Sequence, residues 1–230
     1  MISLSSFKGD IIKLMKYISL IIFFVSVAIH LYASLKQDQH LRNISKPFII
    51  LALLGYYCFS TDNISLTIVL ALLFSWLGDV LLIFKGVKWF TFGGVSFMMS
   101  HIFLILSYLT QIDFAKINKV VIVVLPLLFL VIVTIILNRL KIHLPKKLFY
   151  PMYLYLLMNG AMNCFAFFRY LSNPSLAGII TLIGAILFFI SDCTLFFVRF
   201  DKESIIKTHF SVMLTYSLGK FLIISGLMAK

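Results

Sequence analysis

Two aspartates stand inside apolar segments of this 230-residue chain, and their neighbours follow the same pattern. Asp79 lies in the run 73–84, Leu-Phe-Ser-Trp-Leu-Gly-Asp-Val-Leu-Leu-Ile-Phe, and Asp192 lies in the run 188–197. Each follows a small residue and begins the pattern Asp-x-x-Leu-x-Phe. An ionisable side chain at membrane depth costs roughly 2.5 to 3.5 kcal/mol, so each aspartate is a candidate functional residue.

Two carboxylates inside a membrane can have three functions, and the residue types alone do not choose among them. They can couple a proton or cation to transport, act together as an acid and a charge stabiliser in an enzyme, or form a buried hydrogen-bonded pair that only fixes helix packing. A proton- or cation-coupled membrane transporter that uses Asp79 and Asp192 is the alternative to the enzyme that we favour below.

The composition predicts that these aspartates sit in a membrane protein. The chain is 62% hydrophobic and 12% charged, with a mean hydropathy of +1.08, whereas soluble domains are roughly one quarter charged. At about 20 apolar residues per span, the length allows at most about eight helices and leaves no room for a separate soluble domain. We expect an all-α, polytopic fold in which residues 1–230 form one transmembrane helical domain.

The apolar runs predict where the spans begin and end. The aspartates fall in the third and seventh spans, which cross in the same direction, so both lie at a similar depth below the same face. This placement suggests two four-helix halves in the same orientation, related by an axis along the membrane normal. The predicted spans are about 14–34, 47–61, 64–84, 93–110, 119–138, 150–170, 176–198 and 208–228.

The formal net charge of +12 predicts contacts with lipids and not with nucleic acid. Most Lys and Arg residues lie in short loops, where they set topology and meet anionic headgroups, and no nucleic-acid motif is present. The loops on the face beside the aspartates carry more cations than the loops on the opposite face. Arg169 is counted among the cations of the opposite face. By the positive-inside rule, the carboxylate face of this multi-pass protein is cytoplasmic. The sequence does not fix an oligomeric state.

Motifs spread over nearly the whole chain point to a family. Taken in order, they resemble the YhhN-like family of lysoplasmalogenases, eight-helix membrane proteins that in animals hydrolyse the vinyl ether bond of lysoplasmalogens. The motifs are Lys46-Pro47 opening the second span, Ser75-x-x-Gly78-Asp79, Phe97-x-x-x-His101, Tyr150-Pro151-x-Tyr153, Asn159-Gly160-Ala161-Met162, Gly184-Ala185-x-x-Phe188-x-x-Ser191-Asp192 and Tyr216.

The resemblance implies a hydrolase, and we expect it to act without a cofactor. It would cleave lysoplasmalogen, a 1-alkenyl lysophospholipid, to a fatty aldehyde and glycerophospho-ethanolamine or glycerophosphocholine. Such an ether breaks when its β-carbon is protonated and water captures the oxocarbenium ion. The family's two aspartates carry over onto Asp79 and Asp192, and we expect them to face each other across a cavity. One would be the acid and the other would stabilise the cation; the sequence leaves open which is which.

Six further residues are candidates for substrate binding. Ser75 is one helical turn before Asp79 and so can hydrogen-bond it, or it is a small residue that permits close packing. Lys220 stands where the family usually has Gln, and we expect it to pair with an aspartate because an unpaired ammonium would be costly. The alternative for His101 is a purely structural hydrogen bond to a carbonyl. The alternative for Asn159 is a hydrogen bond that only holds two helices together. The candidates are Ser75, His101, Tyr155, Asn159, Tyr216 and Lys220.

We expect no metal centre. The cysteines lie in apolar segments without metal-ligand spacing, and the only good ligands at membrane depth are the two aspartates and His101. Those three could form a two-carboxylate, one-histidine site, so metal assistance remains an alternative.

Overall fold

The computed structural model describes residues 4–201 and 209–229, with side chains from residue 9 onward. This part of the chain is almost entirely helical and contains no strand, which confirms the predicted all-α fold. Two short 3-10 helices, η1 (Phe114–Lys116) and η2 (Lys146–Leu148), lie in the connections on either side of α5. The α-helices are α1 (Leu4–Leu35), α2 (Gln39–Ser60), α3 (Leu66–Leu81), α4 (Val87–Leu109), α5 (Lys119–Leu140), α6 (Phe149–Ser172), α7 (Leu176–Phe200) and α8 (His209–Met228).

Each predicted span corresponds to one of these helices, and the largest differences are at N-terminal ends. Helix α2 begins at Gln39, where the sequence predicted a polar loop, and Pro47 lies inside the helix and not in its first turn. The Asp38 side chain caps α2 by accepting a hydrogen bond from the Leu41 backbone N–H at 3.0 Å, which satisfies one of the helix's free donors. Lys46 is therefore held on a helix.

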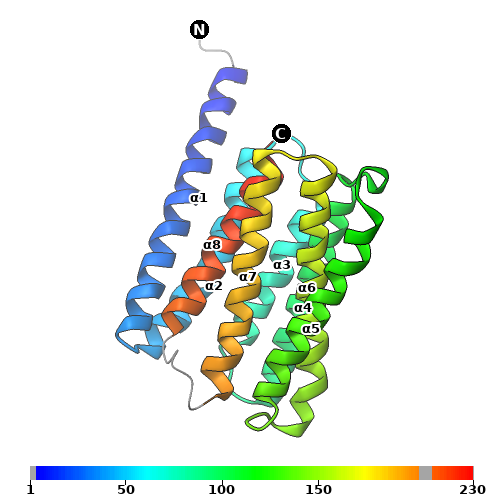
Figure 1. Ribbon diagram of the computed structural model, residues 1–230. Helices are drawn as coiled ribbons and strands as arrows, with labels where there is room; N and C mark the ends of the chain where they lie inside the picture. Colours follow the sequence, from blue (N-terminus) through cyan, green and yellow to red (C-terminus); the bar gives the residue numbers. More distant parts are fainter. Residues whose placement is uncertain (1–3, 202–208, 230) are drawn as a thin grey trace.

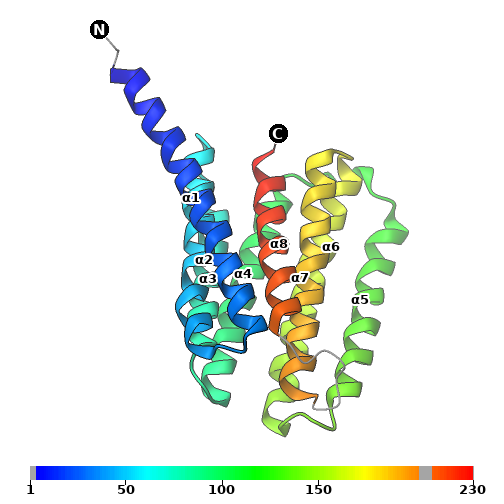
Figure 2. The ribbon, with the colours of Figure 1, turned by 90° about the vertical axis from the view of Figure 1, so that its left-hand side faces the viewer.

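The helices run alternately up and down, so that α1 begins and α8 ends at the same end of the bundle (Figure 1). The connections α1–α2, α3–α4 and α5–α6 lie together at the opposite end. In Figure 2, α1 to α4 form one group and α5 to α8 another. The groups join where α4 packs on α6 and where α1 and α2 pack on α8. That the groups are symmetry-related repeats stays a prediction.

The helices have the composition of membrane spans. Within the described residues, α1, α4, α5, α7 and α8 each contain a segment long and apolar enough to cross a bilayer. Helix α5 is the most apolar of them, and one side of it exposes large aliphatic residues that suit contact with lipid, among them Val120, Val123, Val124, Leu127, Val131 and Ile135. The chain is thus a polytopic helical membrane protein.

Helices α7 and α8 pack closely because glycines face each other between them. A Cβ atom on Gly184 would lie 2.7 Å from the Gly219 carbonyl oxygen, and one on Gly226 would lie 2.3 Å from Oγ1 of Thr181. Ser191 adds a hydrogen bond to the Val212 carbonyl oxygen at 2.8 Å. These contacts fix α7, which carries Asp192, against α8.

Arg169 is buried in the bundle, although the sequence assigned it to a loop. Its side chain is 6% exposed and donates hydrogen bonds to Gln111 Oε1 at 2.7 Å, Thr181 Oγ1 at 2.6 Å and the Gly226 carbonyl oxygen at 3.1 Å. The guanidinium therefore ties α6 to α7 and α8 at the end of the bundle where α8 terminates.

Candidate active site

Asp79 on α3 and Asp192 on α7 line one cavity of about 470 Å³. Both side chains are buried, at 2% and 5% exposure. The lining also includes residues at the ends of helices near the α1–α2 and α3–α4 connections, such as Gln39 and Ile83. The cavity therefore extends from the two carboxylates toward that end of the bundle.

The carboxylate of Asp79 is held by a cation and a phenol. The Lys46 ammonium on α2 lies 3.1 Å from Oδ1, and the Tyr216 hydroxyl on α8 donates to Oδ2 at 2.7 Å. Tyr216 was a predicted site residue, whereas Lys46 was not, although it appears in the Lys46-Pro47 motif. The early start of α2 places Lys46 on the cavity wall.

The carboxyl group of Asp192 has only neutral partners in the described part of the chain. The Tyr155 hydroxyl and the Asn159 amide nitrogen, one turn apart on α6, both donate to Oδ2, at 2.5 and 2.6 Å. No hydrogen bond to Oδ1 joins these contacts among the described residues. Asn163 in turn donates to Asn159 Oδ1 at 3.0 Å, which fixes the orientation of the Asn159 amide.

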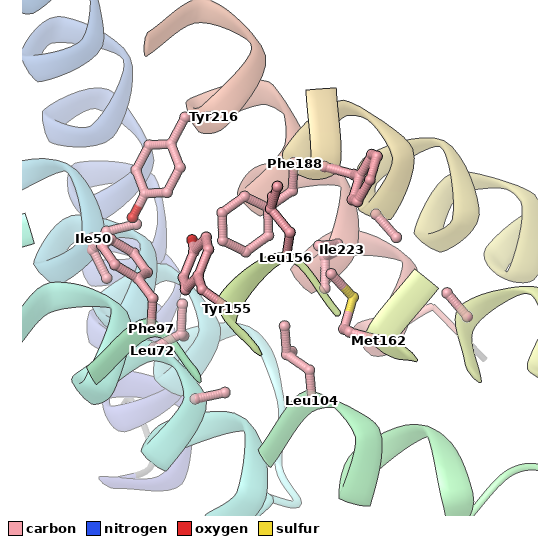
Figure 3. Packing of buried hydrophobic residues seen from close by; sticks show 14 of the residues in the cluster. Ile50, Leu72, Phe97, Leu104, Tyr155, Leu156, Met162, Phe188, Tyr216 and Ile223 are labelled. Atoms are coloured by element: carbon pink, nitrogen blue, oxygen red, sulfur yellow. The ribbon is translucent and has the colours of Figure 1, made fainter. Parts of the chain in front are cut away.

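Each of the two aspartates has a tyrosine hydroxyl as a hydrogen-bond donor, Tyr155 for Asp192 and Tyr216 for Asp79. Figure 3 shows the two tyrosine side chains reaching from α6 and α8 toward the same region of the interior. The Phe188 ring lies 5.6 Å from the Tyr216 ring and the Phe97 ring 6.1 Å from it, as distances between centroids. These two rings therefore pack against the Tyr216 ring, whose hydroxyl donates to Asp79.

Lys220 does not pair with either aspartate, which differs from the predicted ion pair. Its ammonium donates to Ser75 Oγ at 2.7 Å and to Ser100 Oγ at 3.3 Å, and it lies 3.9 Å from the centroid of the Phe188 ring. Ser75 correspondingly bonds Ser100, at 2.7 Å, and not Asp79. Hydroxyl and ring contacts can hold a buried ammonium. Lys220, Ser75 and Ser100 do not line the cavity.

His101 is fully buried beside the site and also lies off the cavity. Its ring centroid is 5.6 Å from that of Tyr155 and 5.1 Å from that of Phe188. Neither ring nitrogen has a hydrogen-bond partner among the described residues, so the structural bond to a carbonyl that the sequence suggested is not formed there. Within this part of the chain, no three His, Cys, Asp or Glu side chains gather as metal ligands.

The cavity wall is polar on one side and apolar on the other. Helices α1, α2 and α8 supply the basic side chains, and α3 with the turn after it, α4, α6 and α7 supply most of the apolar ones together with the two aspartates. Such a surface suits an amphiphile, with a charged headgroup and a hydrocarbon chain on opposite sides. The apolar residues include Leu82, Ile83, Phe90, Val95, Met98, Leu154, Leu195 and Phe196.

Comparison with known proteins gives one family. The model of the YhhN family matches residues 41–227. This range includes Asp79 and Asp192 and their partners Lys46, Tyr155 and Tyr216. No curated protein and no solved structure matches the chain significantly.

Proposed function

The chain belongs to the YhhN family, and on this premise we propose that it is a membrane-embedded hydrolase of the vinyl ether bond of lysoplasmalogen. The products would be a fatty aldehyde and glycerophospho-ethanolamine or glycerophosphocholine. One observation carries the proposal. Two buried carboxyl groups with different partners line a single cavity that is polar on one side and apolar on the other.

The different partners support a separate role for each aspartate in the proposed reaction. An ammonium 3.1 Å from Asp79 favours the ionised carboxylate, which can stabilise a nearby cation. Asp192 receives both of its hydrogen bonds on Oδ2, so a proton on Oδ1 leaves these contacts intact. Asp192 is therefore the proton donor in the proposed reaction, and Asp79 is the negative charge beside the oxocarbenium ion. Buried carboxyl pairs in glycosidases divide acid and charge-stabilising roles in a similar way.

The proposed reaction has three steps. The π electrons of the vinyl ether take the Asp192 proton onto the β-carbon, which leaves an oxocarbenium ion next to Asp79. Water adds to this cation and returns a proton to Asp192, giving a hemiacetal. The hemiacetal then collapses: its hydroxyl loses a proton and becomes the aldehyde carbonyl, the C–O bond to glycerol breaks, and the glycerol oxygen gains a proton in exchange, so that the aldehyde is released. No redox partner is needed.

The direct test is aldehyde release from lysoplasmenyl-ethanolamine by the purified protein in detergent. General acid catalysis by Asp192 and charge stabilisation by Asp79 each contribute about 100-fold or more, so Asp79→Asn and Asp192→Asn should each lower turnover at least about that much while eluting as folded protein. Asp113→Asn is the matched control, because Asp113 is a surface residue paired with Lys116 at 3.6 Å. In D₂O, the aldehyde should carry one deuterium on the carbon next to the carbonyl.

Two outcomes would reject the assignment. Retention of more than about a tenth of wild-type turnover by both Asn variants is incompatible with general acid catalysis by this pair. Absence of aldehyde from both ethanolamine and choline lysoplasmalogens would exclude these substrates. Detergent contains no ion gradient, so turnover there would also distinguish a hydrolase from a coupled transporter.

A further inference from the structure

A basic cluster lies on the cavity wall and meets Asp79 through one of its members, Lys46. It consists of His30 on α1, Arg42 and Lys46 on α2, and His209 at the start of α8. Arg42 and Lys46 are four residues apart, so they lie on the same face of α2. The charges of Arg42 and Lys46 both act on the rings of His30 and His209. The four side chains are therefore close enough for their charges to interact.

Of the two permanently charged members of this basic cluster, Arg42 is the one without a counter-ion among the described residues. Lys46 pairs with Asp79, and His30 Nδ1 is hydrogen-bonded to Ser45 Oγ at 3.0 Å. The half-buried Arg42 side chain makes no ion pair within the described part of the chain, and its buried Nε atom has no hydrogen-bond partner there. A partly desolvated guanidinium without an acceptor is costly, so an anion that entered the cavity would find a donor group ready to bind it.

The charges along the cavity wall match an anion with a single charge. The formally charged lining residues are Arg42, Lys46, Asp79 and Asp192. With Asp192 protonated, as the acid must be before reaction, Lys46 and Asp79 cancel and the guanidinium remains as one positive charge. A phosphodiester carries one negative charge, and the planar guanidinium matches phosphate oxygens in geometry.

We propose that Arg42, with His30 and His209 beside it, forms a binding site for a phosphate group, and that in the lipid substrate this group is the headgroup phosphate. The site lies on the polar wall, and the hydrocarbon chain would then lie along the opposite apolar wall. The proposal that the site binds phosphate depends only on the residues of the basic cluster. The identification of the bound molecule as a lipid substrate depends on the proposed function.

Binding of compounds that cannot be hydrolysed tests the site independently of catalysis. The probes are an alkyl ether lysophosphatidylcholine, the alkylglycerol of the same chain length without phosphate, and inorganic phosphate. Isothermal titration in detergent should show that Arg42→Gln weakens binding of the ether lysophospholipid about tenfold or more, the loss expected for one charge-assisted hydrogen bond. Binding of the alkylglycerol should not change, and Arg42→Lys should lie between the wild type and Arg42→Gln.

Arg139→Gln is the matched control, because Arg139 lies in the last turn of α5 at the same end of the bundle and does not line the cavity. Equal weakening by Arg139→Gln, or unchanged lysophospholipid binding in both Arg42 variants, would overturn the proposal. Inorganic phosphate that binds as tightly as the ether lipid, in a manner that depends on Arg42, would assign the site to free phosphate. Arg42-dependent lipid binding without aldehyde release from lysoplasmalogen would retain the phosphate site and reject the proposed hydrolase.

Discussion

The ammonium of Lys46 lies 3.1 Å from Oδ1 of Asp79 and makes the two carboxyl groups of the cavity unequal. Asp79 has a cation and a phenol as partners, whereas Asp192 has a phenol and an amide. The sequence gives the aspartates nearly the same neighbours, so the difference arises from residues on other helices. The assignment of Asp192 as acid and Asp79 as charge stabiliser depends on this difference.

Lys46→Gln should destabilise the protein because it leaves the buried Asp79 carboxylate without its cation. Removing one partner of a buried ion pair costs about 3 kcal/mol or more. Because the Lys46 side chain is 20% exposed, we expect a smaller loss, about 2 kcal/mol of unfolding free energy. Unfolding in detergent measures this loss. The double variant Lys46→Gln/Asp79→Asn should recover most of it, because no charge is then left alone. Additive losses would show that the two residues are not coupled.

Lys220→Gln should have the opposite effect on stability. Lys220 is as buried as Asp79, but its partners are the Ser75 and Ser100 hydroxyls and the Phe188 ring. Glutamine keeps a donor for the hydroxyls and removes the desolvation cost of a charge, so the unfolding free energy should stay the same or rise by about 1 kcal/mol. A loss as large as that expected for Lys46→Gln would mean that the ammonium is needed as a counter-charge for the aspartates.

Tyr155→Phe should lower kcat about tenfold. The hydroxyl 2.5 Å from Oδ2 stabilises the carboxylate that forms as Asp192 gives up its proton, and a hydrogen bond to a charged group is worth about 1.5 kcal/mol or more. Asn159 would still hold the carboxyl group in place, so KM should change little. Tyr153→Phe is the control, since Tyr153 lies on the same helix and its hydroxyl is 3.2 Å from Thr134 Oγ1, away from the cavity. Equal loss in both variants would indicate damage to α6 and not to the site.

The bundle was predictable because apolar runs alternate with polar loops along the chain, and the aspartates were predictable because a charge inside an apolar run is rare. Lys46 escaped prediction as a site residue for a physical reason. Pro47 is favoured in a first turn, so the sequence placed the start of α2 there and left Lys46 in a loop. The available signal was the acidic cap at Asp38 with basic residues four apart at Arg42 and Lys46, which predicts an earlier helix start.

Arg169 and Lys220 mark the limit of sequence reasoning in this fold. A cation near the end of a span has the pattern of a loop residue. The acceptors of Arg169 come from α7, α8 and the connection after α4, and no local pattern encodes them. The partners of Lys220 likewise come from α3, α4 and α7. Such contacts depend on tertiary packing, which the local pattern of a single sequence does not reveal.

Gly184→Ala should destabilise the protein and reduce its turnover, because α7 must then move away from α8. The added Cβ would lie 2.7 Å from both the Gly219 carbonyl oxygen and the Ile223 backbone nitrogen. These are backbone atoms that cannot rotate away, and overpacking of this kind costs about 1 to 3 kcal/mol. Gly94→Ala is the control for unfolding, since a Cβ there meets nothing within 4 Å and alanine favours the helix. Because α7 carries Asp192, turnover should fall in Gly184→Ala even among molecules that remain folded. Unchanged unfolding and turnover in Gly184→Ala would mean that the α7–α8 contact can open without moving Asp192, and that the position of the acid is set by Tyr155 and Asn159 alone.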